Sequence, residues 1–432
     1  MEADGLRDDF YCSILAYSYR ADCLAVGLGF KAYLWNEERG LIHPPPQLEV
    51  HPSIHRPAYI TSLAFSSEAG GKAILAVGRV DGRLMLWSPL DTEARFMPLT
   101  MPHSAAHLSF RPQTRRRQSQ RHESMMADNE VLLVGDDYGN VWVFLVEWPR
   151  EQDRFLYGWD GGLALIAKID VHVQQICGIA WSADGEYFST GGNDNLCCLF
   201  QANVLFGSLP SEIASTMAIR RDASGQQFVS LGPNGMPQTI LGLEHVRHFW
   251  RLTAAVKAMA FCPWQRGLLA AGGGSNDRCI HFYHTMSGAC LATIDCAAQV
   301  TSLIWSTNRR EIAVTLGFPQ PEHPYRIIVY AWPSCEQIVA IPWHDEMRAL
   351  YAIPYPGGPN EKRRSSQDPD SWRYRTADEE CMVVAGSDGS IKFHEIWSRD
   401  RTAVGPGKGL LGGSDILESL HGIEKEFGET IR

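Results

Sequence analysis

The stretch ICGIAWSADGEYFSTGGNDNLCCLF (176–200) holds three apolar runs separated by two short polar turns. The runs are short and rich in Ile, Trp, Tyr, Phe and Leu, which is typical of β-strands and not of helices. The segment GGNDN between the second and third runs supplies Gly, Asn and Asp, the residues that tolerate the positive φ of tight hairpin turns. The stretch therefore predicts three antiparallel strands joined by hairpins.

The same pattern recurs seven times along the chain. First runs lie at 11–18, 60–66, 106–110, 176–182, 256–262, 300–306 and 348–354. Second runs lie at 23–27, 74–78, 131–135, 187–191, 268–272, 311–315 and 382–386, and third runs are AYLW, LMLW, VWVF, CCLF, IHFY, IIVY and IKFH. Three clear strands and a less regular fourth make one propeller blade. We therefore predict an all-β fold, a seven-bladed WD40 β-propeller over residues 9–397.

Three insertions stretch the repeat, at 111–130, 201–250 and 355–380. They are polar, charged or rich in Pro and Gly, so we expect loops, and we interpret Arg115–Arg117 as solvated loop charge. Residues 1–8 are expected to be the remnant of an N-terminal linker. Residues 398–432 are expected to be a flexible tail, in which Ser414 caps a short amphipathic helix that Gly428 ends.

Composition excludes several classes of function. The formal net charge of −10 over 432 residues disfavours a general binder of nucleic acid or of anionic membranes. No long apolar run predicts a membrane span, and MEADGLRDDF lacks the features of a signal peptide, so we expect nuclear and cytoplasmic localisation.

Eleven cysteines without a CxxC pair indicate small buried apolar residues, not a zinc site. His281 and His284, three apart on a strand, point to opposite faces. We predict neither a metal nor a cofactor, and no catalysis.

The segments DDFYCSILAYS (8–18), ICGIAWSADGEYFSTGGNDNL (176–196) and CPWQRGLLAAGGGSNDRCIHFYHTMSGAC (262–290) resemble the Fizzy and Fizzy-related co-activators of the anaphase-promoting complex. The resemblance covers residues 8 to about 397, more loosely in the third, sixth and seventh units, and the last two residues. It implies a protein that binds degrons, the short peptides that mark substrates for ubiquitination, and presents them to the ligase. The family's N-terminal C box does not appear, so we expect the chain to begin inside a longer ancestral sequence.

The resemblance implies two degron sites. Five residues correspond to the site for the KEN motif, namely Asn193, Asn195, Ser275, Gln299 and Arg348. Their amides suit hydrogen bonds to a peptide, and Arg348 suits the glutamate. Asp9 matches the family's acid for the arginine of a destruction box. The family's second acid is replaced here by Gly389, and we expect Asp388 to take its role. Ala16 stands where the family has an acid for the KEN lysine, so we expect destruction boxes to bind better than KEN peptides.

Alternatives remain open at these residues. Asn193 and Asn195 also suit hairpin turns without any ligand, and Asp9 also suits a solvated terminal charge.

The last two residues, Ile431 and Arg432, match the family's terminal pair, which docks into a tetratricopeptide-repeat groove of the ligase. The expected partners are therefore subunits of the anaphase-promoting complex and degron-bearing substrates. A second hypothesis is a scaffold propeller that has lost degron binding or ligase activation. A propeller enzyme is a third, disfavoured because no nucleophile elbow, metal cluster or carboxylate pair stands out.

Overall fold

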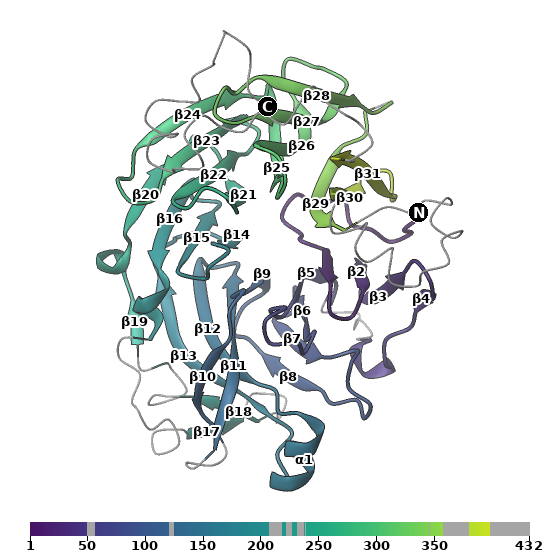
Figure 1. Cartoon of the computed structure of the whole chain (residues 1–432), viewed down its shortest axis with the longest axis vertical. Coiled ribbons are helices and arrows are strands. Elements are labelled where there is room, and N and C mark those ends of the chain that lie inside the picture. Colours follow the sequence, from purple (N-terminus) through teal and green to yellow (C-terminus); the bar gives the residue numbers. More distant parts are fainter. Residues whose placement is uncertain are drawn as a thin grey trace. The chain divides into compact units, whose positions relative to one another are not determined.

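The computed structural model describes residues 1–49, 57–120, 125–206, 218–221, 227–230, 237, 239–344, 346–356 and 380–397. Within these residues the strands form seven sheets that follow one another along the chain (Figure 1). Each predicted three-run unit becomes one sheet, so the predicted seven-bladed β-propeller is confirmed. The chain divides into two compact units, Tyr11–Arg251 and Met1–Phe10 with Leu252–Arg432.

The unit Tyr11–Arg251 contains the first four sheets. The first two are β1 (Leu15–Ser18), β2 (Cys23–Leu28), β3 (Lys31–Asn36) and β4 (Gly40–Ile42), then β5 (Ile60–Phe65), β6 (Leu75–Arg79), β7 (Arg83–Trp87) and β8 (Met97–Thr100). The third is built on β9 (Ala105–Phe110), β11 (Met126–Asp136), β12 (Asn140–Glu147) and β13 (Gly162–Asp170). The fourth is β14 (Ile176–Trp181), β15 (Tyr187–Gly192), β16 (Leu196–Gln201) and β20 (His248–Arg251).

The third sheet is larger than predicted, because parts of two expected loops are strands. Residues 111–130 contain β10 (Arg115–Gln118), which pairs antiparallel with the first part of β11. Residues 201–250 contain β17 (Ala218–Arg221), β18 (Gln227–Ser230), β19 (Thr239–Leu241) and most of β20, and β18 and β19 pair in parallel with β13. The expectation of plain loops there is wrong, because outer strands keep a solvated face and so tolerate a polar composition.

Short helices lie in the connections between the strands of this unit. The only α-helix among the described residues, α1 (Glu151–Tyr157), connects β12 to β13, and 3₁₀ turns lie at Pro46–Leu48, Ala202–Leu205 and Leu243–His245. None of the described helices has the length and apolar character that a bilayer crossing requires.

The other unit contains the last three sheets. Their strands are β21 (Val256–Phe261), β22 (Leu268–Gly273), β23 (Cys279–His284) and β24 (Cys290–Asp295), then β25 (Ala298–Trp305), β26 (Glu311–Pro319), β27 (Tyr325–Ala331) and β28 (Gln337–Pro342), and finally β29 (Ala349–Tyr355), β30 (Glu380–Gly386) and β31 (Ile391–Trp397). Of the expected insertion 355–380, residues 357–379 lie outside the described residues. The tail 398–432, with its predicted helix, lies outside them too.

Residues of the N-terminal segment form backbone hydrogen bonds with the last sheet. Glu2 forms an isolated antiparallel bridge with Ser390, and the amide of Ala3 donates to the carbonyl of Gly389 at 2.8 Å. The Ile391 amide donates to the Met1 carbonyl at 2.9 Å, and Ala3 is 2% exposed. Only three strands of this sheet are described. The N-terminal segment adds backbone hydrogen bonds at Gly389 and Ile391, where β31 begins.

An aspartate holds the hairpin turn between the second and third strands in several sheets. In the fourth sheet, Asp194 accepts hydrogen bonds from His172 Nδ1 at 3.0 Å and from the amide of Leu196 at 3.2 Å, while His172 Nε2 lies 2.8 Å from Thr190 Oγ1. Gly192 lacks a side chain where a Cβ would lie 2.4 Å from Asp194 Oδ1. The GxD spacing of the sequence therefore makes room for the carboxylate that fixes the turn.

The cores consist of alternate strand residues, as the period-two pattern requires. The largest cluster of the first unit includes Val131, Leu133, Val143, Ile176 and Phe188, all fully buried. All cysteines are free, and most are buried, although Cys279 is only partly so. Burial raises the pKa of Cys23 and Cys198 to about 12, which keeps these thiols protonated and apolar.

One buried carboxyl group lies between the second and third sheets. Glu130 is 2% exposed and accepts hydrogen bonds from Ser67 Oγ at 2.9 Å and from the Ser67 amide at 3.3 Å. A Cβ on Gly70 would lie 1.8 Å from Glu130 Oε1, so glycine is needed there. Burial raises the pKa of Glu130 to about 7, although the Ser67 hydrogen bonds oppose the rise.

This raised pKa predicts that the protein becomes less stable as pH rises from about 4.5 to about 7. The folded state holds the Glu130 proton over that range while the unfolded chain loses it. We expect Glu130→Gln to be more stable than the parent at pH 8, by on the order of 2–3 kcal/mol, and the difference to shrink towards pH 5. Denaturant unfolding at both pH values measures this, with the exposed Glu38→Gln as control. A difference that does not change with pH would contradict it.

Candidate functional site

The residues mapped to the KEN site lie at turns and strand ends. Asn193 and Asn195 lie in the turn between β15 and β16, and Ser275 lies in the corresponding turn between β22 and β23. Gln299 lies in β25, and Arg348 directly precedes β29. The first two residues belong to one compact unit and the other three to the other unit.

The side chain of Asn193 is already hydrogen-bonded within the chain. Its Oδ1 accepts from the Tyr11 hydroxyl at 2.9 Å, and its Nδ2 donates to Gln174 Oε1 at 2.8 Å. Asn195 has a φ of 68°, the left-handed conformation that asparagine tolerates better than most residues. Both residues thus have a structural role in the turn, and a peptide would have to displace the partners of Asn193.

Gln299 and Arg348 contact neighbouring residues of β26. Gln299 is 8% exposed, and its Oε1 would lie 2.4 Å from a Cβ on Gly317, so the amide packs over that glycine. The Arg348 guanidinium lies over the ring of Phe318, 4.3 Å from the centroid, and Phe318 is 53% exposed. The structure therefore brings an amide, a cation and an exposed aromatic ring together at the end of β26.

A carboxylate of the same chain, that of Asp8, already binds the Arg348 guanidinium. Its Nη2 donates to Asp8 Oδ2, forming an ion pair in which the side chains are 23% and 43% exposed. The backbone of Arg348 exchanges hydrogen bonds with Ser387, whose Oγ accepts at 2.9 Å. The backbone thus fixes the position of Arg348, and its guanidinium holds a carboxylate of the same chain.

Sequence reasoning missed the residues that hold the N-terminal segment here. Lys257, 4% exposed in β21, donates to the carbonyl of Phe10 and lies 5.1 Å from the ring centroid of Phe10 and 4.9 Å from that of Tyr351. A lysine inside the apolar run VKAMAF was the available signal, because a buried ammonium group needs acceptors or aromatic faces.

The two mapped destruction-box acids have partners in the chain. Asp9 Oδ2 lies 3.7 Å from Arg7 Nη2, a partly exposed pair. Asp388 accepts from Lys392 Nζ at 2.5 Å and from Ser390 Oγ at 2.6 Å, as a turn aspartate does. Burial alone would raise the pKa of Asp388, but the hydrogen bonds from Lys392 and Ser390 lower it, so the group is held as a carboxylate.

Ala16 lies among apolar side chains in this chain. It is 7% exposed in β1, opposite Ala25, and belongs to a cluster with Leu34 and Ile60. An aspartate at this position would bury a charge among apolar side chains. We therefore expect Ala16→Asp to destabilise this sheet.

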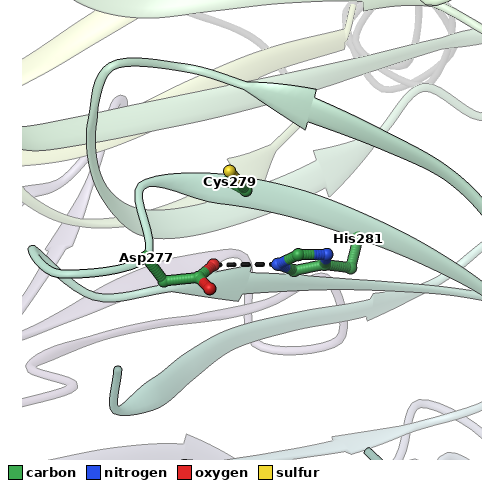
Figure 2. A group of neighbouring side chains, drawn as sticks. All are labelled: Asp277, Cys279 and His281. Atoms are coloured by element: carbon green, nitrogen blue, oxygen red, sulfur yellow. Dashed lines mark hydrogen bonds and ion pairs between the residues drawn. The ribbon is translucent and has the colours of Figure 1, made fainter. Parts of the chain in front are cut away.

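One group of described residues has the composition of a metal site. Asp277, Cys279 and His281 lie together at the start of β23 (Figure 2). His281 Nε2 lies 2.8 Å from Asp277 Oδ2, and its Nδ1 lies 3.2 Å from Thr293 Oγ1. Asp277 Oδ1 also accepts from Thr253 Oγ1 at 2.8 Å, and burial, followed by the nearby Asp277 and Asp295, raises the pKa of the Cys279 thiol to about 11. These hydrogen bonds account for the group as a hairpin turn of the Asp194 type, without a metal.

The terminal pair Ile431 and Arg432 lies outside the described residues.

Comparisons with known proteins connect this geometry to a family. Residues 164–201, which contain the Asp194 turn, match the family model for the WD domain, G-beta repeat. A chain of a solved mitotic checkpoint complex is similar to this chain with a TM-score of 0.59 and 26% identity, covering 92% of this chain and 93% of that chain. The meiosis-specific APC/C activator protein AMA1 of Saccharomyces cerevisiae is 28% identical over all of this chain and 63% of its own length.

The meiotic fizzy-related protein 2 of Schizosaccharomyces pombe is 31% identical over 99% of this chain and 69% of its own length. The chain thus spans about two thirds of the length of these curated relatives. This identity extends over nearly the whole chain, and the fold agrees with it. The chain belongs to the Fizzy family of WD40-repeat proteins.

Proposed function

We propose that this protein is a co-activator of the anaphase-promoting complex in the mitotic or meiotic cell cycle. It binds degron peptides on the propeller, docks to tetratricopeptide-repeat subunits of the ligase through Ile431 and Arg432, and so promotes ubiquitination of its substrates in the nucleus and cytoplasm. The observation that carries the proposal is the 31% identity to the meiotic fizzy-related protein 2 over 99% of this chain. The activator named AMA1 supports the same role.

The chemistry at the end of β26 suits a peptide ligand. Arg348 offers a planar guanidinium that binds a glutamate in two parallel hydrogen bonds, and Phe318 provides an exposed apolar surface beside it. Gln299 forms no hydrogen bond through its amide with the described residues, and Ser275 is exposed. A peptide would therefore reach the exposed Ser275 and an amide of Gln299 without a hydrogen bond among the described residues, beside the guanidinium that Asp8 holds.

A scaffold protein that has lost degron binding is the second candidate. The partners of Asn193 and the Asp8–Arg348 ion pair favour it, because both occupy groups that the family resemblance assigns to the KEN motif. The two candidates differ in a measurable property, the affinity for degron peptides.

The Asp8–Arg348 pair predicts how the peptide affinity changes on substitution. Removing the competing carboxylate with Asp8→Asn is expected to raise the affinity for a KEN peptide by about two- to fivefold, the range for a partly exposed ion pair. Arg348→Ala should lower KEN affinity, and the parent should bind a destruction-box peptide more tightly than a KEN peptide. Fluorescence anisotropy with labelled peptides measures all three.

Asp4→Asn is the matched control, because Asp4 is exposed in the same segment and its substitution removes the same charge. No KEN binding by any variant, with destruction-box binding also absent, would favour the scaffold.

Docking through the terminal pair has its own test. Deleting Ile431 and Arg432 should abolish co-precipitation with the ligase, because an isoleucine in an apolar pocket and a terminal arginine with its carboxylate supply the contacts. The control replaces Glu429 and Thr430 with alanine and keeps the terminal pair. Both variants should melt like the parent. Retained co-precipitation after the deletion would show that another segment docks.

A further inference from the structure

The arginines at 115–117 lie on a strand and not in a solvated loop. Arg115 and Arg117 are partly buried, whereas Arg116 is exposed. In the pairing of β10 with β11, Arg115 lies opposite Asn129, Arg117 opposite Ala127, and Arg116 opposite Asp128. Directly opposed residues share a face of the sheet, so Arg115 and Arg117 lie on one face and Arg116 on the other.

The two faces differ in charge. Arg116 lies opposite the carboxylate of Asp128, whereas the residues opposite Arg115 and Arg117 are neutral. Arg115 forms no ion pair with the described residues. Burial, and next the neighbouring charge of Arg111, lower the pKa of Arg115. The charge of Arg115 is therefore not balanced by a described carboxylate on β10 or β11, whereas Asp184 and Glu186 interact electrostatically with Arg111.

The guanidinium groups of Arg111 and Arg115 both lie over the ring of Phe206. The Arg115 guanidinium lies 3.9 Å from the ring centroid of Phe206, and that of Arg111 lies 5.9 Å from the same centroid. The Arg111 Nε donates to the carbonyl of Gly185 at 2.8 Å, which fixes the direction of that guanidinium. Phe206 is 8% exposed, so the packing around it holds the ring in position. Two guanidinium groups held against one ring repel each other, and an anion between them would remove that repulsion.

We propose that Arg111 and Arg115, with Arg117 two residues further along β10, bind the phosphate of a phosphoserine or phosphothreonine segment of a protein partner. Guanidinium groups match phosphate oxygens with paired hydrogen bonds, and a phosphate dianion carries the charge that two cations require. Nucleic acid is the less suitable source of phosphate. A net charge of −10 opposes a long polyanion, whereas a single phosphate group needs only this local cluster.

The test uses the whole chain and a short phosphothreonine peptide with Gly-Ser flanks, labelled for fluorescence anisotropy. The phosphopeptide should bind, and the unphosphorylated peptide should bind at least about tenfold more weakly. Inorganic phosphate should compete with it. Arg115→Gln should weaken phosphopeptide binding by about tenfold, whereas Arg116→Gln, the matched control on the opposite face of the same strand, should change it by less than about twofold.

Several results would overturn the proposal. They are equal binding of the phosphorylated and unphosphorylated peptides, equal losses for Arg115→Gln and Arg116→Gln, and tighter binding of a single-stranded oligonucleotide than of the phosphopeptide. Thermal melting of each variant separates a lost site from a lost fold. Should Arg115→Gln fail to fold, Arg115→Lys provides the second variant. It keeps the charge but loses the paired geometry, and should still bind the phosphopeptide several-fold more weakly than the parent.

Discussion

A buried aspartate in the hairpin between the second and third strands connects sequence, fold and site in this protein. In the fourth sheet the carboxylate of Asp194 accepts hydrogen bonds from His172 and from two backbone amides, those of Val173 and Leu196. Asp136 accepts in the same way from Tyr138, Asn140 and Trp142, and Asp277 and Asp388 occupy the corresponding turns of later sheets. Because the buried carboxylates of Asp194 and Asp136 each satisfy several donors at once, the loss of either would leave buried polar groups unpaired.

The same turns carry Asn193, Asn195, Ser275 and Asp388, four of the residues that the family resemblance assigns to degron binding. This coincidence explains why Asn193 and Asn195 are ambiguous: the turn uses Asn193 through Tyr11 and Gln174, and uses the left-handed conformation of Asn195. The groups best suited to a ligand are instead next to the end of β26, where Arg348 and Gln299 lie on Phe318 and Gly317. There the N-terminal segment, through Asp8, competes with any acidic ligand for Arg348.

The sequence predicted what depends on local patterns. Each of the seven three-run units became a sheet, because strand alternation and hairpin residues act over short distances. Contacts between distant residues were not predictable. The Asp8–Arg348 pair joins residues 340 apart, and Arg79, 1% exposed, donates to the carbonyls of Phe30, Leu48 and Ala58. The strand β10 over Arg115–Gln118 was missed for a related reason, since only its pairing with β11 shows that these arginines lie in a sheet.

The proposed function places degron peptides beside Arg348 and the end of β26. Photo-crosslinking tests it most directly, with a KEN peptide that carries a photoreactive residue next to its glutamate, followed by mass-spectrometric mapping on the whole chain. We expect crosslinks to the segments of the protein that contain Phe318 and Arg348. Excess unlabelled KEN peptide should suppress these crosslinks, and Asp8→Asn should increase them. Crosslinks that map to other segments, or that excess unlabelled peptide leaves unchanged, would contradict it.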